Sequence, residues 1–237
     1  MTLTVAKDKI QAAKSIAILT GAGISAESGI PTFRDAQTGY WAKYNPHELA
    51  SPQAFAANPE LIWRWYLERF RACQNAQPNA AHKALAQLEE QKPLTLVTQN
   101  VDHLHQRAGS KNVLELHGNV YTARCTGCNR LMELDESMQS VPNCQKCGSR
   151  MRPNVVWFGE TLPHQTLEAA WNAFIQCDIA LIVGTSAVVE PAASLGRAAK
   201  QAGAYLIEVN PEVTPLSRFA NLRVSAGAIG GLAALLE

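Results

Sequence analysis

The chain has 237 residues, of which 47% are hydrophobic, and its 21 basic and 20 acidic side chains leave a net charge of +1. This composition excludes a disordered chain and gives no indication of a surface that binds a polyanion. The longest apolar runs are too short to cross a bilayer, and residues 1–10 hold no signal-peptide core. We therefore expect a cytoplasmic protein with no membrane partner, large enough to bury a substantial core as one domain.

Predicted elements of two kinds alternate along the chain. Short apolar runs predict buried strands at 15–20, 94–98, 113–115, 179–183 and 205–209. Longer stretches with helical spacing predict helices at 59–73, 80–91, 100–107, 163–175 and 191–201. Strands that alternate with helices are typical of a parallel sheet covered on both faces. We therefore predict an α/β fold with a Rossmann-like, doubly wound parallel sheet.

Two segments interrupt this alternation. We expect residues 30–77, a loop followed by helices, and residues 119–152 to form a smaller lobe that leaves a cleft against the sheet. The larger, Rossmann-like lobe then takes residues 1–29, 78–118 and 153–237. Both lobes are expected to belong to a single domain spanning residues 1–237.

A glycine-rich turn follows the first predicted strand. Gly21, Gly23 and Ala26 give the pattern G-x-G-x-x-A, in which glycines let the backbone turn tightly and approach a pyrophosphate. That pattern alone fits a purely structural strand-to-helix turn equally well. No strand ending in a carboxylate arrives about 20 residues later, as an ordinary dinucleotide fold requires. Phe33 and Arg34 follow instead in a loop broken by glycine and proline, which predicts a loop over the cofactor, or else a surface loop with one buried aromatic.

Four of the six cysteines have the spacing of a metal site. They form two C-x2-C pairs separated by 15 residues: Cys125, Cys128, Cys144 and Cys147. Two such pairs close a tetrahedral site of four thiolates with no open position, which predicts one structural zinc ion. A redox pair or scattered core thiols are the alternatives. Cys73 and Cys177 fall outside the pattern and are expected to be small core residues.

A histidine stands at the end of a predicted strand, where open sheets present their ligand-binding groups. His117 follows the strand at 113–115, and an imidazole can accept and return a proton near neutral pH. A structural histidine is the alternative. His103 and His105, two residues apart on a predicted helix, point to different faces and are not expected to share a metal.

A phenol and a guanidinium share one face of the helix predicted at 59–73. Tyr66 and Arg69 are three residues apart, so they are neighbours on the helix surface. Arg69 could bind both oxygens of a carboxylate while Tyr66 donates a third hydrogen bond. The pair alone also fits a solvated arginine beside a half-buried tyrosine.

Together these motifs resemble the sirtuins, a family of NAD-dependent protein deacylases. The resemblance runs from about Ile16 to Ala228. The Tyr66-x-x-Arg69 pair stands where class III sirtuins, which remove succinyl and malonyl groups, have theirs, and Ala50 matches the small residue that leaves their acyl pocket roomy. The segments that carry the family resemblance are 21–34, Q-N-V-D at 99–102, L-H-G at 116–118, V-W-F-G-E at 156–160 and G-T-S at 184–186.

The resemblance implies that NAD is the co-substrate. Gln99, Asn100 and Asp102 would contact the nicotinamide and its ribose, although Asn100 or Asp102 could instead cap a helix. Asn210 would hold the adenosine ribose, unless it only forms a turn, and Ala228 would meet adenine through its backbone. The implied set is Gly21, Ala22, Gly23, Ser25, Glu27, Ile30, Phe33, Arg34, Tyr40, Gln99, Asn100, Asp102, Gly184, Thr185, Ser186, Asn210 and Ala228.

The same resemblance implies an acyl-lysine protein as the partner and substrate. His117 would be the base that acts on a ribose hydroxyl after the acyl oxygen has displaced nicotinamide. The peptide would pair with residues 156–160 as an added strand, although a buried core strand is the alternative for this stretch. The implied substrate contacts are Ala50, Tyr66, Arg69, Val156, Trp157, Phe158, Gly159 and Glu160.

We therefore predict an enzyme that removes succinyl, malonyl and acetyl groups from lysine, with nicotinamide and O-acyl-ADP-ribose as products. Mono-ADP-ribosyl transfer from NAD would use the same cofactor site without an acyl pocket. A zinc-ribbon module that binds nucleic acid or protein is the remaining alternative. Residues 119–152 hold five basic and three acidic side chains, too small an excess to predict nucleic-acid binding.

Overall fold

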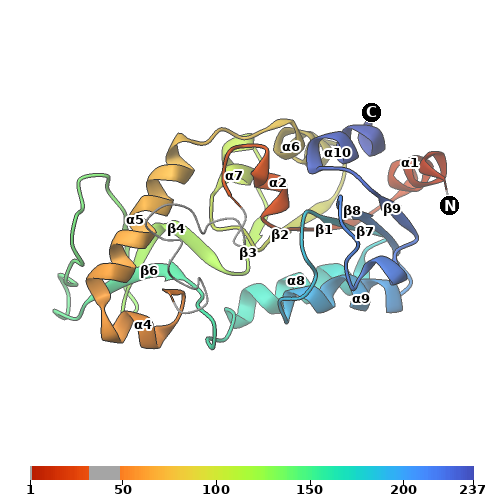
Figure 1. The fold of residues 1–237 in the computed structure, drawn as a ribbon. Coiled ribbons are helices and arrows are strands. Elements are labelled where there is room, and N and C mark those ends of the chain that lie inside the picture. Colours follow the sequence, from red (N-terminus) through yellow and green to blue (C-terminus); the bar gives the residue numbers. More distant parts are fainter. Residues whose placement is uncertain (1, 32–48) are drawn as a thin grey trace.

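A parallel sheet runs through the larger part of the molecule (Figure 1). The computed structural model describes residues 2–31 and 49–237. Within them this sheet has six strands in the order β3-β2-β1-β7-β8-β9, and all neighbouring strands are parallel. Their bounds are β1 Ile16–Thr20, β2 Leu94–Thr98, β3 Val113–Glu115, β7 Ile179–Val183, β8 Tyr205–Val209 and β9 Leu222–Val224.

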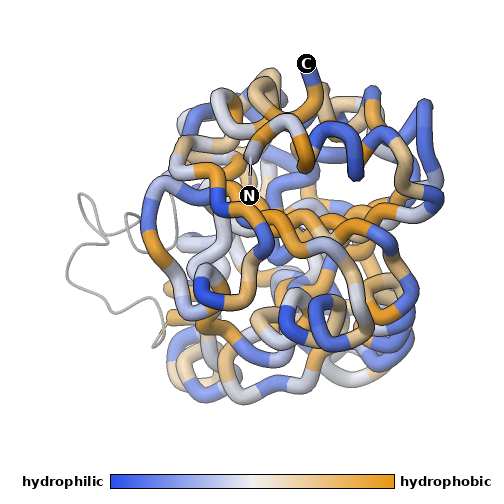
Figure 2. The backbone as a smooth tube through the Cα atoms, turned by 90° about the vertical axis from the view of Figure 1, so that its right-hand side faces the viewer, coloured by the Kyte–Doolittle hydropathy of each residue, from blue (hydrophilic) through white to orange (hydrophobic). Residues whose placement is uncertain are grey.

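Helices cover both faces of the sheet, which explains why its central strands are almost wholly apolar. Every residue of β1, β7 and β8 is buried. Figure 2 shows hydrophobic segments crossing the middle of the molecule between more hydrophilic outer ones. One face packs against α1 (Leu3–Ala12), α6 (Ala80–Gln91) and α10 (Ala228–Leu236), and the other against α8 (His164–Gln176) and α9 (Ala192–Gln201).

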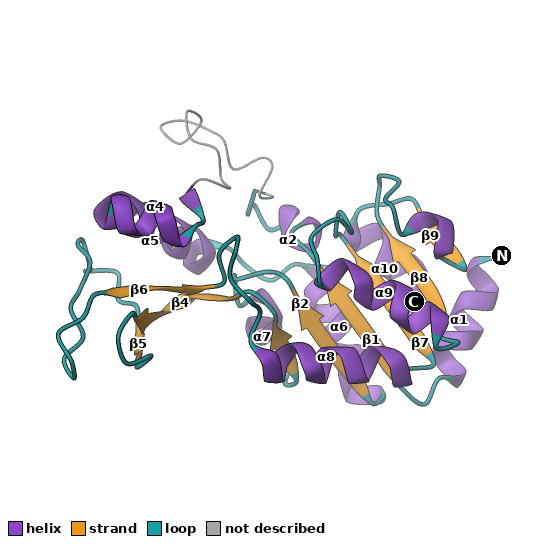
Figure 3. Ribbon diagram, turned by 90° about the horizontal axis from the view of Figure 1, so that it is seen from below, coloured by secondary structure: helices purple, strands orange, loops and turns teal. Residues whose placement is uncertain are grey.

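A second, antiparallel sheet lies with two helices at one end of the molecule (Figure 3). Its strand order is β5-β4-β6. Trp63 and Leu67 on the neighbouring helix α5 pack against Ala123 and Met151 of this sheet. The elements are β4 Gly118–Cys125, β5 Leu131–Glu133, β6 Met151–Val155, α4 Pro52–Ala57 and α5 Pro59–Asn75.

The predicted α/β fold, with a doubly wound sheet and a smaller lobe, is confirmed. Four of the five predicted strands have the bounds expected from sequence, and β1 begins one residue later, at Ile16. Sequence patterns do not predict β9, because it is a three-residue edge strand whose residues are only half-buried. Three short elements complete the described chain: α2 (Gly23–Ala26), α7 (Leu104–Ala108) and the 3-10 helix η2 (Ser217–Phe219).

The prediction of a helix at 100–107 is wrong at its start, since α7 begins only at Leu104. His103 has a φ of 57°, in the left-handed region, and this conformation interrupts a helix. The backbone N–H of Asn100 donates to Thr98 Oγ1 at 3.0 Å, which holds residues 98–100 in a turn before α7. The other predicted helices agree with the structure within two residues at each end.

Two adjacent glycines of α10 provide a test of the packing between α10 and the sheet. A Cβ atom at Gly231 would lie 2.3 Å from Val209 Cγ1 on β8, whereas one at Gly230 would meet nothing within 4 Å. We expect Gly231→Ala to lower the free energy of unfolding by about 1–3 kcal/mol through overpacking. Gly230→Ala should instead stabilise the protein by up to about 1 kcal/mol, because alanine favours the helix. Denaturant titrations measure both, and equal effects would contradict this packing.

Candidate functional site

The loops that follow β1 and β7 are in direct backbone contact at the carboxyl edge of the sheet. Gly21 N donates to Val183 O at 3.0 Å, and Gly23 N donates to Gly184 O at 2.8 Å. A Cβ atom at Gly21 would lie 2.8 Å from Gly184 O, and one at Gly23 would lie 2.8 Å from Gly184 Cα. Both glycines are therefore required for the two loops to pack, whatever the loops bind.

A buried serine on α2 connects the loops that follow β1 and β2. Ser25 Oγ donates to Asp102 Oδ2 at 2.7 Å and accepts from Asn100 Nδ2 at 3.1 Å. Asn100 Nδ2 also donates to Gly21 O at 3.1 Å. Burial raises the pKa of the Asp102 carboxyl above its ordinary value. Three predicted cofactor residues thus form one hydrogen-bonded group.

Asp102 also contacts the first residue of α7, although the N-cap of this helix is His103. Asp102 Oδ1 accepts from Leu104 N, the first amide of α7, at 3.0 Å, while Oδ2 accepts from Ser25. Asn100 instead lies before the turn, and its side chain binds Gly21 and Ser25. The contact with the start of α7 therefore accounts for one oxygen of Asp102 and for nothing at Asn100.

His117 follows β3 and is held by a backbone carbonyl. Its Nδ1 lies 3.0 Å from Gln99 O. A carbonyl can only accept, so Nδ1 carries the hydrogen in the neutral ring and Nε2 keeps its lone pair. Burial lowers the pKa of His117 below its ordinary value, which favours this neutral form. The geometry therefore leaves His117 able to accept a proton at Nε2.

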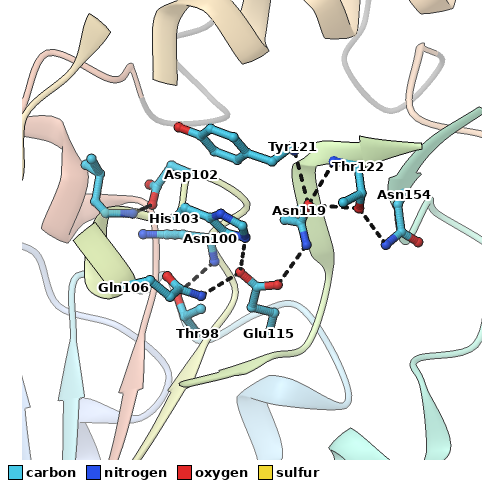
Figure 4. A network of polar contacts seen from close by, with 11 residues as sticks. Thr98, Asn100, Asp102, His103, Gln106, Glu115, Asn119, Tyr121, Thr122 and Asn154 are labelled. Atoms are coloured by element: carbon cyan, nitrogen blue, oxygen red, sulfur yellow. Dashed lines mark hydrogen bonds and ion pairs between the residues drawn. The ribbon is translucent and has the colours of Figure 1, made fainter. Parts of the chain in front are cut away.

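A carboxylate that sequence reasoning missed braces this region (Figure 4). Glu115 Oε1 lies 2.9 Å from His103 Nε2 and accepts from Gln106 Nε2 at 2.8 Å, while Oε2 accepts from Asn119 Nδ2 at 2.9 Å. Tyr121 stacks on the His103 ring, with centroids 4.5 Å apart. Glu115 thus connects the segment around α7 to the strands that flank His117. The available signal in the sequence was that Glu115 stands two residues before His117.

The remaining histidines of this region contact separate partners. His105 Nε2 lies 2.9 Å from Thr20 Oγ1, whereas His103 contacts Glu115. His82 lies beside His105, with ring centroids 4.9 Å apart, and its Nδ1 lies 3.0 Å from Asn79 Oδ1. Burial lowers the pKa of His82 to about 4 and that of His105 to about 3. Both rings are therefore neutral at physiological pH.

The loops after β2, β7 and β8 meet at Thr185. Gln99 Nε2 donates to Thr185 Oγ1 at 2.8 Å, and Asn210 Nδ2 donates to Thr185 O at 2.8 Å. Asn210 Oδ1 also accepts from Glu212 N at 3.0 Å, so the turn considered for this residue exists alongside its contact with Thr185. Gly184 has a φ of 61°, and Ser186 is half-buried in the same loop.

The other predicted cofactor residues lie around the same loops. Glu27 Oε1 accepts from Ile229 N at 3.1 Å, which places it at the start of α10 beside the buried Ala228. Ala22 and Ile30 are half-buried, and Ile30 N donates to Ser25 O at 3.3 Å. Three further predicted residues lie outside the part of the chain that the structure describes: Phe33, Arg34 and Tyr40.

Tyr66 and Arg69 are less exposed than an ordinary surface pair. Tyr66 is 5% exposed, and burial raises the pKa of its phenol to about 12. Arg69 is half-buried, and its guanidinium carbon lies 4.7 Å from the Trp65 ring centroid. The solvated arginine considered from sequence is therefore wrong. Ala50, also buried, belongs to the same hydrophobic cluster as Tyr66 and Trp157.

The stretch after β6 is partly exposed and partly built into the core. Val156 N donates to His117 O at 2.9 Å, and Phe158 N donates to Ala50 O at 2.9 Å. Phe158 is 37% exposed, whereas the Trp157 side chain is 2% exposed. Glu160, the last residue of the stretch, forms an ion pair with Arg152. Gly159, which precedes Glu160, has a φ of 86°.

The four predicted metal ligands converge. The Sγ atoms of Cys125, Cys128, Cys144 and Cys147 all lie within 4.8 Å of one another. Cys125 Sγ also accepts from Gly127 N at 3.3 Å and Cys128 N at 3.4 Å, contacts that stabilise a thiolate. Four converging thiolates without a carboxylate or an open position fit a structural tetrahedral site. Cys73 is buried and Cys177 half-buried, both outside this cluster.

Comparison with known proteins connects this arrangement to one family. The model of the Sir2 family matches residues 21–191, more than half of the chain. The chain belongs to the Sir2 family. An NAD-dependent protein deacylase of Thermus thermophilus is 53% identical over 236 residues, which cover 98% of this chain and 92% of that protein. The predicted sirtuin family is thus confirmed, and deacylase relatives of this kind support the class III assignment.

Solved structures of Sir2 proteins have the same fold. A Sir2 homologue in complex with NAD is 48% identical with a TM-score of 0.94, covering 100% of this chain and 93% of that one. A Sir2 protein bound to acetylated peptide is 35% identical with a TM-score of 0.88, covering 98% of this chain and 96% of that one. Among the described residues, no helix of this Sir2 protein has the length and apolar character needed to span a membrane.

Loss of a cysteine ligand should remove the metal and destabilise the protein. We expect Cys125→Ser and Cys144→Ser to lose bound metal and thermal stability together, because a closed thiolate site contributes its binding energy to folding. Cys177→Ser, outside the cluster, is the control and should keep its metal. Elemental analysis and thermal melts test this, and a cluster variant that keeps one metal ion per chain at unchanged Tm would contradict the assignment.

Proposed function

We propose that this Sir2 protein is an NAD-dependent protein-lysine deacylase that removes succinyl, malonyl and acetyl groups. The observation that carries this proposal is the hydrogen bond from His117 Nδ1 to Gln99 O, because it leaves a basic nitrogen on a ring beside the meeting point of the strand-end loops. Its deacylase relatives and the Sir2 structures with NAD and with acetylated peptide support it.

The chemistry of the side chains around these loops fits NAD. Ser25, Asn100, Asp102 and Gln99 offer hydroxyl, amide and carboxylate groups suited to an uncharged amide and a ribose. Gly184, Thr185, Ser186 and Asn210 would serve the phosphates and the adenosine ribose, with Ala228 near the adenine. When bound, NAD supplies a ribose carbon that takes the acyl oxygen as nicotinamide leaves.

In this proposal His117 moves one proton. Nε2 would accept it from a ribose hydroxyl, while Gln99 O holds the ring through Nδ1 and fixes its orientation. Burial keeps His117 neutral, which is the form that can accept a proton. The partner substrate would be an acyl-lysine protein lying along residues 156–160, a stretch in which Phe158 is 37% exposed.

Peptide-dependent nicotinamide release tests the proposed activity as a whole. Acetylated, succinylated and unmodified peptides are incubated with the enzyme, with and without NAD. Nicotinamide release that requires both NAD and an acylated peptide supports deacylation. Release with the unmodified peptide, accompanied by labelling of that peptide with ADP-ribose, would instead indicate ADP-ribosyl transfer.

Loss of His117 should abolish most turnover. We expect His117→Ala to reduce kcat by about a hundredfold or more, as for a missing general base, while the protein remains folded. In the wild type, kcat/KM should decline only below about pH 6.5, because burial lowers the pKa of His117 from that value. His164→Ala, which removes an exposed histidine on α8, is the control. Near-normal turnover in a folded His117→Ala protein would remove this residue from the mechanism.

The Tyr66 and Arg69 pair underlies the proposed preference for acidic acyl groups. Arg69 would bind the carboxylate of a succinyl or malonyl group, and Tyr66 would donate a further hydrogen bond to it. The buried Ala50 would leave room for the longer chain. Because the phenol pKa is raised to about 12, Tyr66 keeps its hydrogen for donation at neutral pH. We further propose that the zinc site has no role in this chemistry, since four thiolates leave no position for water.

Arg69→Met should damage desuccinylation far more than deacetylation. Losing a charge-assisted contact in a partly buried pocket should cost on the order of 2–4 kcal/mol, or roughly thirtyfold to a thousandfold in kcat/KM. Acetyl-lysine has no carboxylate, so its kcat/KM should fall by a few-fold at most. Arg71→Met, on the exposed side of the same helix, is the matched control. Equal losses on both substrates would indicate that Arg69 only supports the fold.

A further inference from the structure

Tyr66 is hydrogen-bonded by a residue from the proposed peptide-binding stretch. Trp157 Nε1 lies 3.0 Å from Tyr66 Oη, and both side chains are buried. Trp65 packs edge-on against the Tyr66 ring, with centroids 4.7 Å apart and planes at 75°. The phenol is therefore held by contacts from two elements, α5 and the stretch after β6.

The chemistry of the two groups decides which one donates. An indole N–H can only donate, so Trp157 is the donor and the Tyr66 oxygen accepts. This bond occupies a lone pair of the phenol and leaves the phenolic hydrogen unused. Within residues 2–31 and 49–237, this hydroxyl forms no second hydrogen bond. In the proposed function this hydrogen would be donated to a ligand on the side of α5 that carries Arg69.

Trp157 is itself held firmly. The Arg152 guanidinium carbon lies 3.3 Å from the Trp157 ring centroid, and Arg152 is 6% exposed. Glu160 accepts from Arg152 Nη2 at 2.9 Å and from Trp157 N at 2.8 Å. The cation covers one face of the Trp157 ring, and the carboxylate holds the Trp157 backbone. The indole N–H is therefore presented in one direction.

We propose that Trp157 is a specificity-determining positioning residue, whose indole N–H orients the Tyr66 hydroxyl so that the phenolic hydrogen is donated to the carboxylate of an acyl group bound by Arg69. This inference rests on the proposed function and extends it. It assigns acyl selectivity to three residues, one of which reaches the acyl pocket from the peptide-binding stretch. Trp157 acts through Tyr66 and needs no contact with the acyl group.

A double-mutant cycle tests this role. The measured quantity is the ratio of kcat/KM for a succinylated peptide to kcat/KM for the acetylated peptide, so that losses common to both substrates cancel. We expect Trp157→Phe to lower this ratio by about threefold to tenfold, as for one oriented hydrogen bond. In a Tyr66→Phe background the same substitution should change the ratio less than twofold, because the oxygen that Trp157 orients is gone.

Trp63 provides a matched control for Trp157. It is a buried tryptophan on α5, and its Nε1 has no hydrogen-bond partner in the described part of the chain. Trp63→Phe should therefore leave the ratio unchanged. If Trp157→Phe fails to fold, site-specific replacement of Trp157 by benzothienylalanine, whose sulfur replaces the N–H at nearly equal size, gives the same test.

The outcomes separate this inference from the proposed function. A lowered ratio in Trp157→Phe that depends on Tyr66 supports the inference. An unchanged ratio in Trp157→Phe, with a strongly lowered ratio in Arg69→Met, overturns the inference and leaves the proposed function intact. Additive losses in the double mutant also overturn it. A wild-type enzyme that removes acetyl but not succinyl groups contradicts the proposed acyl preference, and this inference with it.

Discussion

The site depends on the close backbone contact between the loops that follow β1 and β7. Gly21 and Gly23 lie against Gly184 at distances that leave no room for a side chain. This contact places Gly21 O where Asn100 can bind it, and Asn100 precedes the turn that leads to Asp102. Gln99, the neighbour of Asn100, then supplies the carbonyl that orients His117. One steric constraint is therefore connected to the proposed base through two hydrogen bonds and the peptide bond between Gln99 and Asn100.

Burial shifts the pKa values of two groups in this region. It raises the pKa of Asp102 and lowers that of His117, which disfavours the charged form of each. Asp102 offsets part of this cost by accepting hydrogen bonds from Ser25 and Leu104. Glu115, by contrast, has three polar partners: His103, Gln106 and Asn119 (Figure 4). Burial thus favours the neutral form of His117, while the Asp102 oxygens accept hydrogen bonds from Ser25 and Leu104.

Local sequence patterns predicted the sheet well, because each central strand is an apolar run covered on both faces. They failed at the start of α7, because helical spacing does not reveal the left-handed backbone of His103. The cysteine cluster was predictable, since its spacing alone fixes which thiols can converge. The hydrogen bond from Trp157 to Tyr66 joins residues 91 positions apart, and no local pattern signals it. Contacts of that kind arise only from tertiary packing.

The buried pair His82 and His105 couples unfolding to proton uptake. Their folded-state pKa values, about 4 and about 3, lie below the ordinary value of 6.5 that the unfolded chain restores. Between those values the unfolded state binds more protons than the folded state, so the free energy of unfolding decreases as the pH falls from 6.5 toward 4 and 3. Above pH 6.5 neither histidine contributes a pH dependence. The two rings that support α7 and the loop after β1 are thus a built-in source of acid lability.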